Sequence, residues 1–321
     1  MLYLVKLKFL SPVHFGKVGI GIENSEEILH SDSLFSALCH AWGILYGKTE
    51  LGDLLQGFDG ALPFLLSSGF LYRGDTFFLP KPLCRSPGFE DVGIREKFGR
   101  DMKKTKYLPL EVFERWVKGL DIAYESLKES YPRYQDGFNS FLTPRVALDR
   151  MSSNSELFQC GLVQFREGAG LYFLVRIEDD EILRKMGNCL GLSGETGLGG
   201  ERTYGYGRFE AEFPPAGERW ERLFEERGDC VTTLSLYHPE VPPAEVIGEA
   251  SYDLQERGGW IHSPFWKKQF KRKTVVMFRE GSVFKSGIKG HLVDVTPSIW
   301  DRDEIHPIYR YGYALTVPLS A

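Results

Sequence analysis

The segment from Gly187 to Gly207 constrains the fold of this chain more than any other, because it holds eight of the 35 glycines in 21 positions. At the average frequency of the chain, roughly two would be expected there. A glycine has no Cβ, so it adopts positive φ without strain and lets a ligand approach the main chain. Successive N–H groups in such a loop can cradle a phosphate, and Arg202, Tyr204 and Tyr206 add a charge and two stacking faces. The composition equally suits a tight turn between a helix and a strand, so both interpretations stay open.

The apolar pattern predicts a mixture of helices and strands. The first ten residues alternate like a strand, and Ser31 or Asp32 can cap a helix whose apolar residues recur at three- and four-residue steps up to Leu45. We expect 157–165 and 171–177 to pair as a hairpin around the glycine-containing turn 166–170. Further helices are expected over 108–120, 121–129 and 178–190, and further strands over 208–213, 231–237, 274–278, 282–286 and 311–317.

The chain of 321 residues is long enough for one large or two ordinary domains. Pro214-Pro215 and the stretch 217–228 form the best candidate boundary. We predict the α+β class, with two ferredoxin-like βαββαβ units carrying insertions. The predicted domains are 1–216, which contains the glycine loop at 191–207, and 228–321.

Composition places the chain among folded globular proteins, since 42% of its residues are hydrophobic and 26% are charged. No apolar run approaches the eighteen or so residues of a membrane span, and the first ten residues lack the features of a signal peptide. We therefore expect a cytoplasmic protein. The five cysteines are scattered without a C-x-x-C pair, which argues against a disulfide framework or a zinc site.

Charge is distributed unevenly along the chain. The overall balance is -5, but residues 260–321 carry ten Lys and Arg against five Asp and Glu, so residues 1–259 carry 29 against 39, or -10. Such asymmetry is compatible with an anionic ligand on selected surfaces. The net negative charge therefore does not exclude RNA as a partner.

Motifs for nucleotide binding and catalysis do not fit this sequence. The glycine segment lacks the G-x-G-x-x-G pattern, and Gly43 to Thr49 has one residue too few for a Walker A loop, so we interpret it as a helix end. None of the seven histidines has zinc-site spacing. The acidic cluster Asp301, Asp303 and Glu304 is interpreted as a solvated surface. The sequence thus predicts no metal, no cofactor and no convincing catalytic set.

His14 and His30 are the histidines that a folded-back loop could bring to one groove. A histidine pair can serve as general acid and base in RNA cleavage without a metal. His30 directly precedes Ser31-Asp32, however, which favours a role at a capped helix entry.

Three cationic stretches combine positive charge with aromatic or polar residues. They are Lys103 to Tyr107, Lys267 to Lys273, and Thr143 to Ser155, and the last contains Arg145, Arg150 and Ser153. Interleaved charges and aromatics are typical of proteins that bind single-stranded RNA by backbone contact and stacking. Each stretch taken alone also suits an ordinary solvated face.

The first helix and the glycine loop resemble hallmark segments of the RAMP superfamily (repeat-associated mysterious proteins) of CRISPR systems. The matching residues are HSDSLFSAL at 30–38 and GLGGERTYGYGRF at 197–209. Further segments narrow the resemblance to subunit four of the Csm family, the crRNA-capping subunit of type III-A interference complexes in antiviral defence. These are LPKPL at 79–83, the stretch 145–150, LSLYHP at 234–239, GWI at 259–261, EGSVF at 280–284 and HPIYRYGYA at 306–314.

The resemblance implies two ferredoxin-like (RRM-related) domains that face each other and bind the five-prime, repeat-derived handle of crRNA. It also implies contact with the large palm-domain signalling subunit and with the first backbone subunit, target RNA being reached only indirectly. A thumb-like hairpin, placed here at about 143–165, would wedge into the guide–target duplex. No nuclease activity is implied for this subunit.

The residues expected to contact RNA follow from the resemblance and the patterns together. They are His14, Lys17, His30 and Ser31 in the groove, Arg145, Arg150 and Ser153 at the thumb, and Gly197, Gly199, Gly200, Arg202, Tyr204 and Gly205 in the loop. Two alternatives remain: a RAMP-type endoribonuclease that processes repeat RNA through His30, and a scaffold that binds protein only.

Overall fold

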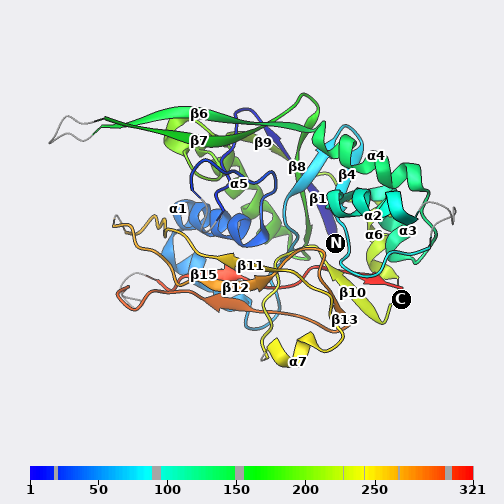
Figure 1. Ribbon diagram of the computed structural model, residues 1–321. Helices are drawn as coiled ribbons and strands as arrows, with labels where there is room; N and C mark the ends of the chain where they lie inside the picture. The colour runs from blue at the N-terminus through cyan, green and yellow to red at the C-terminus, as the bar shows by residue number, and fades with distance from the viewer. Residues whose placement is uncertain are drawn as a thin grey trace.

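A computed structural model describes residues 1–17, 21–88, 95–148, 155–226, 228–241, 243–266, 268–300 and 306–320. The first part of the chain contains β1 (Leu2–Phe9), α1 (Ser31–Gly57), β2 (Leu65–Leu66), β3 (Phe70–Arg73), β4 (Thr76–Pro80), α2 (Arg95–Lys104), β5 (Tyr107–Pro109), α3 (Leu110–Val117), α4 (Tyr124–Gln135), β6 (Phe138–Leu148), β7 (Ser155–Phe165), β8 (Ala169–Arg176), α5 (Asp180–Thr196), the 3-10 turn η2 (Arg202–Tyr204) and β9 (Phe209–Glu212). The second part contains α6 (Glu218–Glu225), β10 (Cys230–Thr233), α7 (Pro243–Ile247), β11 (Leu254–Arg257), β12 (Val275–Phe278), β13 (Val283–Lys285), β14 (Leu292–Asp294), β15 (Tyr309–Tyr311) and β16 (Thr316–Leu319). The structure is a mixed α/β fold with antiparallel sheets (Figure 1).

The largest sheet has the strand order β5-β4-β3-β8-β1-β9, with β2 also paired to β8. Strand β8 lies in its interior and is buried along seven consecutive residues, which explains why its sequence is a continuous apolar run. Val5 of β1 pairs with Phe173 of β8, and Leu7 pairs with Ala211 of β9. Helices α1 and α5 pack against each other and present Leu34, Leu38 and Met186 to the core.

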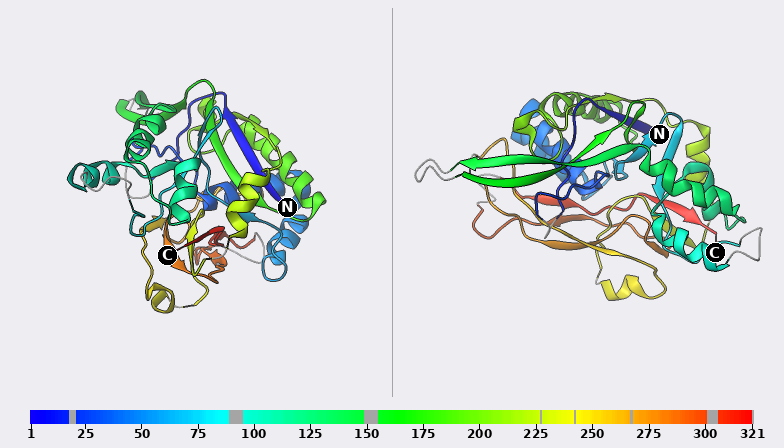
Figure 2. Two further views of the ribbon diagram at one scale, coloured as in Figure 1. Left: turned by 90° about the vertical axis from the view of Figure 1, so that its right-hand side faces the viewer. Right: turned by 45° about the horizontal axis from the view of Figure 1, so that its top comes forward.

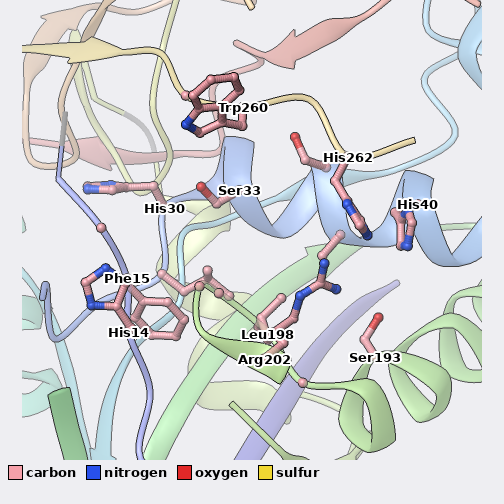
Figure 3. A pocket seen from close by; sticks show the side chains of 18 of the residues that line it. His14, Phe15, His30, Ser33, His40, Ser193, Leu198, Arg202, Trp260 and His262 are labelled. Atoms are coloured by element: carbon pink, nitrogen blue, oxygen red, sulfur yellow. The ribbon is translucent and has the colours of Figure 1, made fainter. Parts of the chain in front are cut away.

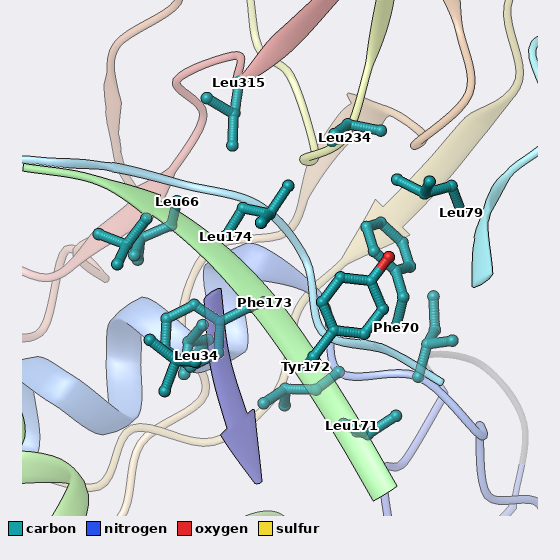
Figure 4. Packing of buried hydrophobic residues seen from close by; sticks show 14 of the residues in the cluster. Leu34, Leu66, Phe70, Leu79, Leu171, Tyr172, Phe173, Leu174, Leu234 and Leu315 are labelled. Atoms are coloured by element: carbon teal, nitrogen blue, oxygen red, sulfur yellow. The ribbon is translucent and has the colours of Figure 1, made fainter. Parts of the chain in front are cut away.

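The second part of the chain is made mainly of short strands. Its described residues form the sheet β13-β10-β16 and the two-stranded ribbons β11-β12 and β14-β15. Strands β11, β12 and β15 run beneath α1 (Figure 1). Its core is continuous with that of the first part, because Leu234 and Leu315 pack in one apolar cluster with Leu174 and Leu79 (Figure 4). The two parts are therefore held together by shared burial.

Strands β6 and β7 form a long antiparallel ribbon that projects from the body of the molecule (Figures 1 and 2). Its register runs from Phe138 opposite Phe165 to Leu148 opposite Ser155. The predicted pairing of 157–165 with 171–177 is therefore wrong, since β8 pairs with β1, β2 and β3 instead. The ribbon begins at Phe138, ahead of the expected thumb start at 143.

The observed helices bear on two further expectations. Gly191 and Gly194 lie inside α5, so the glycine loop begins at Gly197 and not at 191. The stretch 217–228, expected as a boundary, contains α6, whose Trp220 and Leu223 are buried in the core. No described helix is long and apolar enough to span a bilayer.

Candidate nucleic-acid interface

An open cavity of about 690 Å³ lies between α1, the glycine loop and the segment that follows β11. Figure 3 shows His14, His30, His40 and His262 around it, with Arg202 and Trp260 on its walls. The first helix and the glycine loop, which are far apart in the sequence, thus form two walls of one site. The described lining contains one carboxylate, Glu26, against several cationic side chains: Lys17, Arg202, Arg257, Lys271, Arg272 and Arg310.

The glycine loop owes its composition first to close main-chain packing. Gly197, Gly199, Gly205 and Gly207 all have positive φ, between 78° and 97°. A Cβ on Gly199 would lie 2.6 Å from the carbonyl oxygen of His14, and one on Gly207 would lie 2.1 Å from that of Leu198. No side chain can take these places, so the loop follows a path that only glycine permits.

Several amides of the loop are already bonded within the protein. The Gly197 amide donates to the Ser193 carbonyl at 2.8 Å, and the Gly205 amide donates to the Arg202 carbonyl at 2.9 Å. The Gly200 amide donates to the His14 carbonyl, and the Gly207 amide to the Pro12 carbonyl, both at 2.8 Å. Gly199 and Gly205 are nevertheless solvent-exposed, and Gly197, Gly199 and Gly200 line the cavity. The tight-turn interpretation is therefore confirmed, and the loop at the same time forms a wall of an open site.

His14 and Lys17 reach the cavity from the segment after β1. The ring of His14 is buried and its Nδ1 lies 2.8 Å from the carbonyl oxygen of Gly161 in β7. The amide of Gly200 donates to the His14 carbonyl at 2.8 Å. His14 thus connects the projecting ribbon to the glycine loop.

His30 is buried between two carboxylates at the start of α1. Its Nδ1 lies 2.8 Å from Oε1 of Glu280, and its Nε2 lies 3.0 Å from Oε2 of Glu26. Burial disfavours the charged ring, but the charge of Glu280 and the hydrogen bonds to Glu26 and Glu280 together outweigh it and raise the pKa of His30 to about 9. Near neutral pH the ring is therefore an imidazolium whose two nitrogens both face carboxylates. The amide nitrogen Nε2 of Gln255 also lies 3.1 Å from His30 Nε2.

Ser31 does not line the cavity. Its side chain is fully buried, its amide donates to Ser68 at 2.8 Å, and its hydroxyl accepts a hydrogen bond from the Leu236 amide at 3.1 Å. Its partners place Ser31 in the contact between the two parts of the chain and not in the cavity lining.

Asp32 holds two buried arginines of the second part at the N-terminus of α1. Arg257 donates to both carboxylate oxygens at 2.9 and 2.8 Å, and Arg310 donates to one of them at 2.5 Å. Burial works against the charged carboxylate, but Arg257 and Arg310 outweigh it and hold the pKa of Asp32 below its usual range. One carboxylate between two guanidinium groups leaves a net positive charge on this wall of the cavity. Burial, with the charges of Arg272 and Arg257, lowers the pKa of Arg310 to about 9, although Asp32 opposes this.

Comparison with known proteins decides the family. A model of the RAMP superfamily matches residues 6–210, and a model described as the CRISPR Csm4 C-terminal domain matches residues 226–319. The chain belongs to the RAMP superfamily. The resemblance to subunit four of the Csm family is confirmed as well, since this RAMP protein is 29% identical over 304 residues to the CRISPR system Cms protein Csm4 of Thermococcus onnurineus (strain NA1), with 92% of each chain covered.

Two solved structures share the fold of this RAMP protein. One is a Csm3-Csm4 subcomplex in the type III-A CRISPR-Cas interference complex, with a TM-score of 0.66, 20% identity and coverage of 99% of this chain and 100% of that one. The other is a Csm1-Csm4 cassette in complex with pppApA, with a TM-score of 0.65, 21% identity and coverage of 100% and 98%.

The remaining predicted residues of this RAMP protein lie at or beyond the edge of the cavity. Tyr204 and Gly205 of the glycine loop are exposed and do not line the cavity, and Arg145 of β6 stacks over the Tyr204 ring. Arg150 and Ser153 lie outside the described residues. The cationic stretch 267–273 contributes Lys271 and Arg272 to the cavity, whereas Lys103 to Tyr107 lies at another surface.

Sequence reasoning missed His40, Arg257, Trp260, His262 and Arg310 as lining residues of this RAMP protein. His40 lies two helical turns beyond Ser33 on α1, and that spacing was available as a signal. Trp260 and Arg310 lie within segments that carried the family resemblance. Among the described residues, no three His, Cys, Asp or Glu side chains gather in an arrangement that would hold a metal ion.

Proposed function

We propose that this protein is a non-catalytic, crRNA-binding subunit of a type III-A CRISPR interference complex, which caps the five-prime handle of crRNA. The observation that carries the proposal is the cavity between α1 and the glycine loop, where cationic side chains outnumber carboxylates. An exposed Trp260 beside these charges offers a face on which a base can stack. A positive, partly aromatic cavity suits a sugar–phosphate chain better than a small neutral ligand.

We also propose that the protein joins the large palm-domain subunit to the backbone filament. The related structures support this, since one holds Csm4 with Csm1 and the other holds Csm4 with Csm3. The exposed apolar side chains of the ribbon β6–β7, among them Leu142, Val146 and Leu157, support the assignment of this ribbon as the thumb at the guide–target duplex.

The expected ferredoxin-like units, 1–216 and 228–321, remain proposals about architecture. In the first unit, the antiparallel order β3-β8-β1-β9, with α1 after β1 and α5 between β8 and β9, supports the βαββαβ arrangement. In the second unit the support is weaker, because its described sheet β13-β10-β16 has three strands.

The absence of catalysis is part of the proposal, with a His30-dependent endoribonuclease as the alternative. A general base must offer a free lone pair to the proton that it removes. His30 is buried, its pKa is raised to about 9, and both its nitrogens face carboxylates, so it lacks such a lone pair near neutral pH. Incubation of repeat RNA with the protein in chelator tests this directly: specific cleavage that disappears in His30→Ala would overturn the non-catalytic assignment.

Handle-RNA affinity measured by fluorescence anisotropy tests the binding proposal. We expect Arg202→Glu to weaken binding about ten- to a hundredfold, because a charge-assisted contact with a phosphate is replaced by repulsion. Arg184→Glu, an equal change of charge on an exposed position of α5 outside the cavity, serves as the control. Equal affinity of both variants and the parent protein would remove the loop from the interface. Assembly of the complex without any RNA crosslink to this chain would favour the protein-only scaffold.

A further inference from the structure

Three nitrogen-bearing side chains from distant parts of the chain converge in one corner of the cavity. His40 comes from α1, Arg202 from the glycine loop and His262 from the segment after β11. The ring centroids of His40 and His262 lie 4.6 Å apart. Figure 3 shows the guanidinium of Arg202 directed toward both rings.

In the described lining, no carboxylate is available to pair with His40, Arg202 and His262. Glu26 is the one carboxylate among the described lining residues, and it is bonded to His30. The Nδ1 atom of His40 is buried without a hydrogen-bond partner, which is unusual for a polar atom in a folded protein. Within the described part of the chain, Arg202 forms no ion pair with a carboxylate. The corner thus has the properties of an anion site.

The pKa values of both histidine rings are lowered in this corner. Burial lowers the pKa of His40 to about 4, and repulsion by a protonated His262 and by Arg202 acts in the same direction. Burial and Arg202 likewise lower the pKa of His262. Both rings are therefore neutral at pH 7, and an anion placed between them and Arg202 would favour their protonation.

We propose that Arg202, His40 and His262 form a subsite for one backbone phosphate of single-stranded RNA, and that filling this subsite draws a proton onto the histidine pair. The inference rests on the proposed function, since the RNA supplies the phosphate. Arg202 provides the permanent charge, and the two imidazoles provide a charge that depends on pH. RNA binding through this site therefore strengthens as the pH falls.

The other groups around the pair do not reproduce this behaviour. Arg272 and His306 face the same corner from the second part of the chain, and Cys39 neighbours His40 on α1. Arg272 stays charged across the physiological range, and burial raises the pKa of Cys39 further above that range. Both ring nitrogens of His306 already have partners, the Ser263 hydroxyl at 2.7 Å and the Pro307 carbonyl oxygen at 2.8 Å. His14 lies elsewhere in the cavity and is retained in the variants below.

The first test measures the affinity of the full chain for single-stranded handle RNA at pH 6 and pH 8. An anion within 4–6 Å raises a histidine pKa by about 1–3 units, so we expect about three- to tenfold tighter binding at pH 6. The double variant His40→Asn, His262→Asn should lose most of this dependence while it still binds at pH 8 through Arg202. His291→Asn is the control, because His291 pairs with His238, with ring centroids 5.0 Å apart. This variant should retain the pH dependence. A parent protein without pH dependence, or a double variant that keeps it, would overturn the subsite.

The second test separates the subsite from the proposed function. It follows the imidazole signals of His40 and His262 by NMR in a pH titration, with and without inorganic phosphate. Raised histidine pKa values in phosphate, together with no RNA binding at any pH, would support the anion subsite and refute the RNA-binding function. If phosphate leaves both titrations unchanged, the subsite is refuted even where the RNA binds. If the double variant does not fold, the single variant His262→Asn, at an exposed position, replaces it in the affinity measurements. His40 is then the remaining ring of the pair.

Discussion

The guanidinium carbon of Arg145 lies 3.9 Å from the centroid of the Tyr204 ring, and 5.3 Å from that of Tyr206. This stack joins the middle of the projecting ribbon to the outer side of the glycine loop. The loop is thereby held from two directions, by His14 on the cavity side and by Arg145 on the ribbon side. A displacement of the ribbon would therefore be transmitted to the loop that lines the cavity.

Loss of this stack should loosen the glycine loop. A cation–π contact at an exposed site contributes about 0.5–1 kcal/mol, so Tyr204→Leu should speed amide exchange in residues 197–207 by about two- to fivefold. Hydrogen exchange with mass spectrometry measures this, and Tyr204→Phe, which keeps the ring, should leave the rates near those of the parent. Unchanged exchange in Tyr204→Leu would show that the stack does not restrain the loop.

The sequence allowed the elements around the cavity to be predicted, but not all of their partners. The helix beginning at Ser31 and the glycine loop could be predicted because three- and four-residue periodicity and glycine density are local signals. The pairing of β7 was predicted wrongly because the turn at Gly168 resembles a hairpin turn. The continuous apolar run of β8 was the better guide, since a strand buried on both faces belongs inside a sheet and not in a ribbon.

Glycine counts alone could not separate helix from loop. Gly194 lies within α5, where a Cβ would lie 2.3 Å from the carbonyl oxygen of Phe209, so it serves close packing of a helix on a strand. His40 and His262 could not be paired from the sequence, because their proximity arises only when the second part of the chain folds against α1. The role of Ser31 was hidden for the same reason, since its partners Ser68 and Leu236 come from two distant segments.

The buried ion pair of His30 and Glu280 should make the stability of the protein fall with rising pH. The folded-state pKa of His30 is raised from its ordinary 6.5 to about 9. The stabilisation is therefore complete below about pH 6.5 and is lost as the pH rises toward 9, and it amounts to a few kcal/mol. Urea unfolding between pH 6 and 9 measures the change.

Substitution of the carboxylates separates this effect from general charge effects. Glu280→Gln should cost about 3–5 kcal/mol at pH 6.5, because a buried imidazolium loses one of its partners, and should flatten the pH dependence. Asp253→Asn, which removes an exposed partner of Arg279 at 3.8 Å, should cost less than about 1 kcal/mol and leave the dependence intact. A parent protein whose stability is constant from pH 6.5 to 9 would contradict the charged state assigned to His30.

Gly205 and Gly207 allow the cost of a positive φ to be separated from the cost of a steric clash with a Cβ. Gly205 and Gly207 have φ values of 82° and 78°, but only the Cβ on Gly207 would meet neighbouring main chain. Gly205→Ala should cost about 1–2 kcal/mol from the left-handed conformation alone. Gly207→Ala should cost about 2–5 kcal/mol, because the Leu198 carbonyl must also move. Chemical denaturation of both variants measures the difference, and equal losses would mean that the loop adjusts freely around Leu198.

Trp260 should bind RNA through stacking and not through charge. Its side chain is 57% exposed at the cavity, and the Lys271 ammonium lies 5.3 Å from the ring centroid. Base stacking on an aromatic side chain contributes about 1–3 kcal/mol, so Trp260→Ala should weaken handle-RNA binding by roughly five- to a hundredfold. Tyr252→Ala, which removes another exposed aromatic side chain outside the cavity, is the control.

The salt dependence of RNA binding distinguishes the stacking role of Trp260 from the charge contributed by Lys271. Trp260→Ala removes no charge, so the slope of log affinity against log salt concentration should stay unchanged while the affinity falls. Lys271→Ala should reduce that slope by about 0.7, the value for one phosphate contact with a single strand. A reduced slope in Trp260→Ala would mean that the ring acts by holding Lys271 in place, whereas full affinity in this variant would place the bases of the RNA elsewhere.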